Sequence, residues 1–566
     1  MAGLAGPPGL LAHLDALIEY LTGSHRRAAP ALVVFALLCF LPGFGALPPM
    51  DRDESRFAQA SKQMLETGDF IDIRLQEQVR HKKPVGIYWL QAASVTAAER
   101  LGIANVRTRI SVYRIPSLIG ALGAVLLTYW AALGFVGRRY AFFAGLMMAG
   151  SFLLGVEARL AKTDAMLCLA AVATFGALGR AYLGAALSTA RASWATAAIF
   201  WTALAGSILL KGPVVPLLVA LTILALMVAD RSVRWLLDLR PLPGIAWLLV
   251  LVLPWFIAVT LRTQGEFFEQ SLGGDLFGKL LQGQEGHGAP PGYYFALFWF
   301  TFWPAAVLAP LAVPFVWRAR AEPSVRFLLA WLLPGWLMFE LVVTKLPHYV
   351  LPLYPAAAIL IALALERNVA VDRPTRLAGG LWPLVAIGIL FVGIALAIVV
   401  GGRLVLSFWP LAFASIMLAA LALGLLIAGG AERALTLALL AAVATQATAF
   451  TVLPRVDAAF VAPALAAAAR NMPCRNPLAA SAGFHEPSLV FLVGTPTVLT
   501  NGVGAADFLR LGGCRVAFVE RGEAIRFDAR ARETGLLYAR IGEVRGFNYS
   551  NGRRIAILVL ARKDAE

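Results

Sequence analysis

Long runs of apolar residues, separated by short polar segments, make up most of this chain. A membrane-spanning helix needs about 17 to 25 mostly apolar residues, because the hydrocarbon core of a bilayer is about 30 Å thick. Runs of this length predict thirteen spanning helices, at residues 30–48, 112–134, 140–156, 164–184, 195–210, 213–229, 244–262, 293–316, 325–343, 349–365, 377–400, 405–429 and 434–453. The pattern therefore predicts a polytopic α-helical membrane protein.

The composition agrees with this prediction. Of the 566 residues, 59% are hydrophobic and 14% are charged, and the mean hydropathy of +0.74 lies outside the range of soluble domains. A formal net charge of +16 would suggest nucleic acid in a soluble protein. Here most cations are spread over the loops between spans, where membrane topology and anionic lipid explain them better. We therefore expect membrane lipid, and no nucleic acid, as a partner.

The distribution of lysine and arginine predicts the orientation. An odd number of spans puts the two ends of the chain on opposite sides, and short cytoplasmic loops carry an excess of cations. Cations collect on the amino-terminal side, for example at Arg138, Arg139, Arg231, Arg234, Arg318 and Arg320. Residues 1–29 are therefore predicted to be cytoplasmic, and 30–453 to form the transmembrane domain of a bacterial inner-membrane protein. The loops 49–111 and 263–292 and the tail 454–566 are predicted to face the periplasm.

The tail is predicted to be a small α/β domain. Its short apolar runs at 488–493, 497–499, 516–519 and 555–559 are typical of strands, and a helix is expected near 505–511. Two of the four cysteines, Cys474 and Cys514, also lie in the tail. The periplasm is oxidising, so we favour a disulfide between them over two unpaired thiols.

A polar stretch from Met50 to Leu90 follows the first span. Apolar residues recur at helical spacing after Asp53, and Gly68 is a typical helix end. A second amphipathic run carries Tyr88 and Trp89, which suit a lipid headgroup region. We predict two interfacial helices on either side of a cationic turn.

Two aspartates stand out at the outward ends of spans. A lone carboxylate at such a position is usually solvated or caps a helix. Asp53, however, has Glu54 and Arg56 beside it, and Asp164 follows Glu157, Arg159 and Lys162 on the same membrane face. A carboxylate kept ionised by nearby cations can accept a proton from an acceptor or hold the hydroxyls of a donor.

Four cations lie at the same lipid boundary: Arg56, Lys83, Lys211 and Lys345. A single lysine there would extend its ammonium group to the lipid headgroups. Several aimed at one point would bind a phosphate. Spacing alone leaves phosphate binding and topology equally open for these four.

The loop 263–292 contains Glu285 and His287, a pair that can ligate a metal ion. Two ligands at this spacing are a weak signal, and we favour a role without metal. We accordingly expect no required cofactor, with a divalent cation as the alternative.

Taken together, these motifs resemble a known family. Asp53-Glu54 with Arg56, then Lys83-Pro84 and Tyr88-Trp89, resembles the DE…R…KPP..YW signature of the aminoarabinose lipid A transferases and their protein O-mannosyltransferase-like relatives, which have a GT-C fold. Further motifs follow in the order of that family: Lys162-Thr163-Asp164, Lys211-Gly212-Pro213, His287-Gly288 and 345–352 with His348 and Tyr349.

The resemblance implies an inverting transfer of a sugar from a polyprenyl (undecaprenyl) phosphate donor to an acceptor in the outer leaflet. Asp53 would be the catalytic carboxylate, and Asp164 would support it. The carrier phosphate and the substrates would be held by Glu54, Arg56, Lys83, Tyr88, Lys211, Lys345, His348 and Tyr349. Lys82 stands where aminoarabinose transferases commonly carry an acid. This departure leaves room for other sugars.

The acceptor that we expect is lipid A or another envelope glycolipid. A Ser/Thr hydroxyl of a protein is the alternative within the same family. A lipid flippase would also bind a polyprenyl phosphate, but it would need ionisable residues along a path through the membrane. The motif charges collect at one face, which favours an enzyme.

Overall fold

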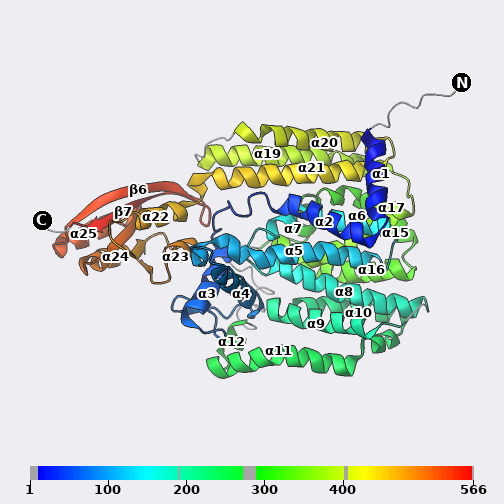
Figure 1. The fold of residues 1–566 in the computed structure, drawn as a ribbon, viewed down its shortest axis with the longest axis horizontal. Coiled ribbons are helices and arrows are strands. Elements are labelled where there is room, and N and C mark those ends of the chain that lie inside the picture. Colours follow the sequence, from blue (N-terminus) through cyan, green and yellow to red (C-terminus); the bar gives the residue numbers. More distant parts are fainter. Residues whose placement is uncertain (1–9, 189–190, 272–287, 401–405, 564–566) are drawn as a thin grey trace.

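The computed structural model describes residues 10–188, 191–271, 288–400 and 406–563. Long helices run side by side along the molecule, and a small sheet domain sits at one end of them (Figure 1). The amino-terminal helix α1 (Leu10–Thr22) lies at the opposite end. The two ends of the chain are thus separated by the length of the helical bundle.

Nine helices in the described part of the chain are long and apolar enough to cross a membrane. They are Ile110–Ala132 (α5), Asp164–Ala186 (α8), Trp194–Lys211 (α9), Pro241–Thr263 (α11), Pro323–Leu341 (α16), Pro347–Glu366 (η6 with α17), Arg373–Leu396 (α18 with α19), Trp409–Ile427 (α20) and Ala431–Arg455 (α21 with η8). The pair Tyr293–Thr301 (α14) and Ala305–Arg318 (η5 with α15) bends by 112° and makes a tenth if it is one span. The chain is therefore a multi-pass membrane protein.

Three of the predicted spans fall on shorter helices. They are α2 (His25–Phe40), α6 (Arg138–Gly150) followed by α7 (Phe152–Glu157), and α10 (Val214–Asp230). Each predicted span thus overlaps helix, although the one predicted at 30–48 is helical only as far as Phe40. The count of thirteen stays a prediction.

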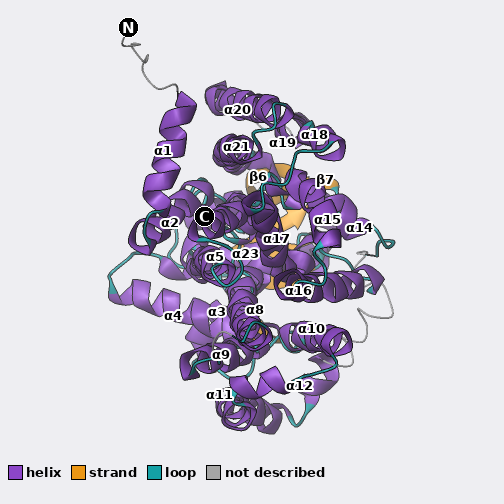
Figure 2. Ribbon diagram, turned by 90° about the vertical axis from the view of Figure 1, so that its right-hand side faces the viewer, coloured by secondary structure: helices purple, strands orange, loops and turns teal. Residues whose placement is uncertain are grey.

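Burial separates central from peripheral helices. The apolar windows of α8 and of η6 (Pro347–Leu353) with α17 (Tyr354–Glu366) are 83% and 89% buried, whereas that of α11 is 22% buried. Figure 2 looks along the helices and has α5, α8 and α17 toward the middle, with α11 and α20 at the periphery. The site residues described below come from the ends of these central helices.

The polar stretch after the first span forms both predicted helices, α3 (Asp53–Thr67) and α4 (Gly86–Arg100). The first ends at Gly68, whose φ of 74° lies in the left-handed region that glycine adopts without cost. Between them lies a two-stranded ribbon of β1 (Arg74–Leu75) and β2 (Gln78–Val79).

The tail has a five-stranded sheet in the order β4-β3-β5-β7-β6. Strands β3 (Leu478–Ala482), β4 (Val498–Thr500) and β5 (Arg515–Glu520) are parallel, and β6 (Tyr538–Asn548) and β7 (Arg553–Arg562) complete the sheet as an antiparallel hairpin. Helices α22 (Val461–Arg470), α24 (Gly502–Arg510) and α25 (Ala524–Glu533) pack against it. Cys474 and Cys514 form a disulfide with a Cα–Cα distance of 5.8 Å.

One predicted strand of the tail is wrong. The apolar run at 488–493 belongs to helix α23 (Pro487–Val493), which packs against α3. A short apolar run does not distinguish a buried strand from a buried helix, and Pro487 at the first helical position favours the helix.

Candidate active site

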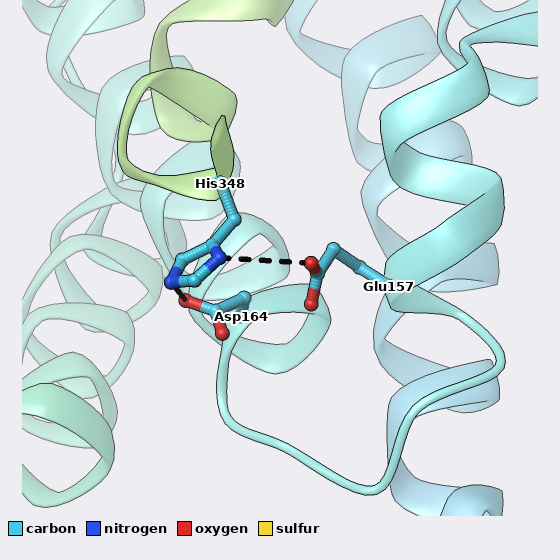
Figure 3. A group of neighbouring side chains, drawn as sticks. All are labelled: Glu157, Asp164 and His348. Atoms are coloured by element: carbon cyan, nitrogen blue, oxygen red, sulfur yellow. Dashed lines mark ion pairs between the residues drawn. The ribbon is translucent and has the colours of Figure 1, made fainter. Parts of the chain in front are cut away.

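Five ionisable side chains, which we call the charged cluster, meet at one end of the central helices. Glu157 ends α7, Lys162 follows in the connecting loop, Asp164 begins α8, Lys211 ends α9, and His348 lies in η6. Lys211 Nζ is 2.5 Å from Asp164 Oδ1, and Lys162 Nζ is 2.9 Å from Glu157 Oε1 and 3.7 Å from Asp164 Oδ2. The His348 ring lies between the two carboxylates, 3.7 Å from Asp164 and 3.8 Å from Glu157 (Figure 3).

The cluster is largely buried, so its charges must balance. Glu157 and Asp164 are 3% and 4% exposed, and an unpaired buried carboxylate would be costly. The ammonium groups of Lys162 and Lys211 offset both carboxylates. Asp164 also gains from its position in the first turn of α8, where the helix dipole favours an anion.

The Asp53 carboxylate lies close enough to this cluster to act electrostatically on Lys162. It begins α3 and is exposed to solvent. Burial opposes the charge on Lys162, but the carboxylates of Glu157, Asp164 and Asp53 more than compensate and raise the pKa of Lys162 above its ordinary value. Lys83 likewise acts electrostatically on His348. The two acidic motifs and the lysine motif thus lie within electrostatic range of the charged cluster.

Glu54 is the residue that joins the two acidic motifs. It is 2% exposed, and its carboxylate makes a bidentate pair with Arg114 of α5 at 2.7 and 2.9 Å. It also accepts the backbone N–H groups of Met50 and Ala161, each at 2.8 Å. Because Ala161 directly precedes Lys162, these bonds fix the start of α3 against the loop of the charged cluster. Glu54 therefore has a structural role, and its part in substrate binding stays a prediction.

Arg114 was missed by the sequence analysis. It is fully buried and also donates to the carbonyl oxygens of Phe44, Leu47 and Pro48. The signal was present, since a charge inside a predicted span is expensive and is usually paired with a partner.

The other predicted binding residues have varied surroundings. Tyr88 is fully buried, and its hydroxyl accepts from Arg80 Nε at 3.3 Å. Tyr349 carries Lys211 Nζ over its ring at 5.1 Å, which brings it to the charged cluster. Lys345 is 3% exposed and donates to the carbonyl oxygen of Val342 at 2.5 Å, within its own turn. Its role in phosphate binding stays a prediction, as does that of the half-buried Arg56.

The charged cluster contains three potential metal ligands, Glu157, Asp164 and His348. One oxygen of each carboxylate already accepts from a lysine, Glu157 Oε1 from Lys162 and Asp164 Oδ1 from Lys211. A divalent cation would meet two ammonium groups there, so the residues do not fit a metal ion in this arrangement. Glu285 and His287, the pair considered above, lie outside the described residues.

An apolar cavity of about 480 Å³ lies near the site. Side chains of α19 (Leu381–Val400) and α21 (Ala431–Val452) line it, together with Phe152 of α7 and Phe300 of α14. Helix α7 connects the two features, since Phe152 at its start lines the cavity and Glu157 at its end belongs to the charged cluster.

Asp51 supplies a pH-dependent contact beside Asp53. Burial raises the pKa of Asp51 to about 7; hydrogen bonds from Ser488 and the charge of Arg56 lower it, and the charge of Glu486 raises it. A carboxyl whose pKa rises on folding stabilises the fold below its unfolded pKa, and this contribution is lost as the pH rises through about 7. We expect the melting temperature to fall between about pH 4 and pH 7, and to fall less in Asp51→Asn. Equal pH slopes in thermal unfolding of the two proteins would contradict this.

Comparisons with known proteins find a family model, relatives and solved structures that are similar to this chain. Residues 50–265 match the family model of the dolichyl-phosphate-mannose-protein mannosyltransferases. Two proteins named undecaprenyl phosphate-alpha-4-amino-4-deoxy-L-arabinose arabinosyl transferase are similar in sequence. The one from Yersinia enterocolitica is 26% identical, over 59% of this chain and 58% of its own. The one from Aeromonas salmonicida is 27% identical, over 64% and 65%. The matches thus span less than two thirds of these relatives.

Among solved structures, ArnT from Cupriavidus metallidurans bound to undecaprenyl phosphate superposes with a TM-score of 0.69 at 20% identity, over 94% of this chain and 97% of ArnT. The chain has the GT-C fold of ArnT. An oligosaccharyltransferase from Archaeoglobus fulgidus shares the fold more distantly, with a TM-score of 0.51 at 13% identity, over 91% of this chain and 69% of its own. The family resemblance and the GT-C fold predicted from the motifs are both confirmed.

Proposed function

We propose that this protein transfers a sugar from an undecaprenyl phosphate carrier to lipid A or another envelope glycolipid. The observation that carries the proposal is an exposed carboxylate, Asp53, fixed beside a buried cluster of lysines and acids in a chain with the ArnT fold. The apolar cavity beside α7 supports a lipid substrate. The sugar named for the similar transferases, 4-amino-4-deoxy-L-arabinose, is the first donor to test.

The proposed reaction is an inverting displacement. An acceptor oxygen attacks the anomeric carbon, the bond from that carbon to the phosphate oxygen breaks, and its electron pair leaves with undecaprenyl phosphate. Lys83 and Arg56 stabilise the charge that develops on the phosphate. A hydroxyl acceptor gives its proton to Asp53, whereas a phosphate acceptor is already anionic and Asp53 then orients it. Lys162 and Lys211 pair with Asp164 and hold its carboxylate in place.

The site would face the periplasm. The sheet domain and the start of α3 lie at one end of the bundle and α1 at the other, and the cations of the short loops assign the α1 end to the cytoplasm. On this basis we infer a cytoplasmic amino terminus and a periplasmic tail, in the inner membrane.

Mass spectrometry of lipid A and whole lipopolysaccharide from cells with and without the protein tests the proposal. Loss of one discrete sugar mass from the glycolipid of the cells without the protein is the expected result. Unchanged glycolipids would contradict it and favour the second candidate, transfer to a protein Ser/Thr hydroxyl, which the match to the protein mannosyltransferase family supports.

Lys83→Ala is expected to raise the KM for the donor about tenfold or more and to change kcat less, because it removes a cation that binds the carrier phosphate. Lys82→Ala is the matched control, since Lys82 is the exposed neighbour in the same motif. Steady-state kinetics with varied donor concentration measure both. An unchanged donor KM in Lys83→Ala would contradict the assignment.

We also expect transfer to continue at full rate after removal of divalent cations with EDTA. The reason is that Lys162 and Lys211 supply the positive charge next to Glu157 and Asp164 that a metal ion would supply. Loss of activity on chelation, restored by adding back a divalent cation, would show that a metal ion takes part.

A further inference from the structure

The turn that leads into Asp53 has a strained backbone. Arg52, the residue before it, has φ 66° and ψ −116°, a combination that is favourable for glycine and rare for a residue with a long side chain. Such a conformation persists only where neighbouring groups impose it.

The holding groups come from the tail, almost 500 residues away. The backbone N–H of Asp51 donates a hydrogen bond to the hydroxyl oxygen of Tyr549 at 2.5 Å. Nη2 of Arg52 donates to the carbonyl oxygen of Ser550 at 2.6 Å. The backbone N–H of Ser488 donates to Asp51 Oδ1 at 3.1 Å. Tyr549 and Ser550 lie in the loop between β6 and β7, residues 549–552. We call this segment, together with Asn548, the last residue of β6, the hairpin loop.

The hairpin loop is itself fixed. Glu486 accepts hydrogen bonds from Asn548 Nδ2 at 2.9 Å and from Ser550 Oγ at 3.1 Å. Glu486 directly precedes α23, which packs against α3 and receives a hydrogen bond from Lys62 Nζ to the Phe491 carbonyl oxygen at 3.0 Å. The hairpin loop that contacts Asp51 and Arg52 is thus itself fixed by Glu486. Glu486 is held in turn by α23, which packs against α3, the helix that begins at Asp53.

We propose that the hairpin loop positions Asp53 for catalysis, by holding Asp51 and Arg52 in the strained turn that sets the direction of the Asp53 carboxylate. This rests on the proposed function. Tyr549 is a positioning residue, because it contacts the backbone two residues before Asp53. On this proposal the sheet domain contributes to the active site through its hairpin loop, which determines how well the Asp53 carboxylate is aligned with the charged cluster.

Tyr549→Phe tests the proposal because it removes only the hydroxyl that accepts from Asp51. Tyr538→Phe is the matched control, since the Tyr538 hydroxyl bonds Asp528 Oδ1 at 2.8 Å in the same sheet and does not contact the turn. Two readouts are compared in the full-length protein: hydrogen–deuterium exchange of residues 50–57, and steady-state kinetics with undecaprenyl phosphate-4-amino-4-deoxy-L-arabinose and lipid A.

In Tyr549→Phe we expect exchange of residues 50–57 to accelerate and kcat to fall about tenfold or more, with the donor KM within about twofold of wild type. Tyr538→Phe should match wild type in both readouts. Glu486→Gln, which weakens the support of the loop, should shift both readouts in the same direction as Tyr549→Phe.

The two readouts separate the two hypotheses. An active wild type with unchanged kcat in Tyr549→Phe would overturn the positioning role and leave the proposed function standing. A wild type without transfer activity would count against the proposed function, and exchange alone would then decide on the loop. Equal exchange of residues 50–57 in wild type and Tyr549→Phe overturns the proposal in either case.

Discussion

Asp53→Asn is expected to reduce sugar transfer by about a thousandfold or more while leaving the protein folded in the membrane. Asparagine has the same shape as aspartate but can neither accept the proton of a hydroxyl nor supply negative charge to the site. Asp53 is exposed, so the substitution removes no buried partner. Rates of transfer with purified protein, together with the melting temperature, measure the two halves of this expectation.

Glu77→Gln is the control for Asp53→Asn, because Glu77 is an exposed acid in the same loop, residues 49–111. It should retain wild-type activity. Substantial sugar transfer by Asp53→Asn would contradict the proposal that Asp53 is the catalytic carboxylate. The pH dependence of kcat/KM then distinguishes the two roles left open for Asp53. A base should give a limb at acidic pH that reflects its protonation, and this limb should disappear in the variant.

The residues that gather at the site are more predictable from the sequence than the way in which they pair. Asp164 and Lys211 were both singled out from the sequence, and they form an ion pair at 2.5 Å. Their motifs adjoin the ends of long apolar runs, which apolar periodicity locates well. The exposed Asp53 and its helix were predicted for the same reason, since α3 begins at that residue.

The different roles of adjacent acids were not predictable. Asp53 and Glu54 have the same charge and similar surroundings in the sequence, yet Asp53 is exposed and Glu54 is buried, with 2% of its surface exposed. What separates them is Arg114, 60 residues further along, and such long-range pairings leave no local pattern. The contact of Tyr549 with Asp51 spans 498 residues and is hidden for the same reason.

The short runs of the tail show a second limit. The run at 516–519 is a strand, and that at 488–493 is a helix. Both are apolar and short, so their packing partners decide their conformation. Helix α23 packs against α3, and β5 pairs with two neighbouring strands.

Glu54→Gln is expected to have the largest effect on stability of any single substitution considered, about 3 to 5 kcal/mol. It removes the counter-charge of the Arg114 guanidinium, and water cannot replace that charge because the Arg114 side chain is fully buried. The free energy of unfolding, or the melting temperature in detergent, measures the loss. Because Glu54 also holds the N–H of Ala161, transfer should fall with stability.

The ion pair between Glu99 and Arg107 is the matched control for Glu54→Gln, because it is equally short but more exposed to solvent. Its closest N–O distance is 2.7 Å, equal to that of Glu54 and Arg114, but its side chains are 33% and 44% exposed. Water already solvates such a pair, so Glu99→Gln should cost about 0 to 1 kcal/mol. Similar small costs for both substitutions would mean that Glu54 does not join the two acidic motifs. A large cost confined to Glu54→Gln would tie the alignment of Asp53 with the charged cluster to this one buried pair.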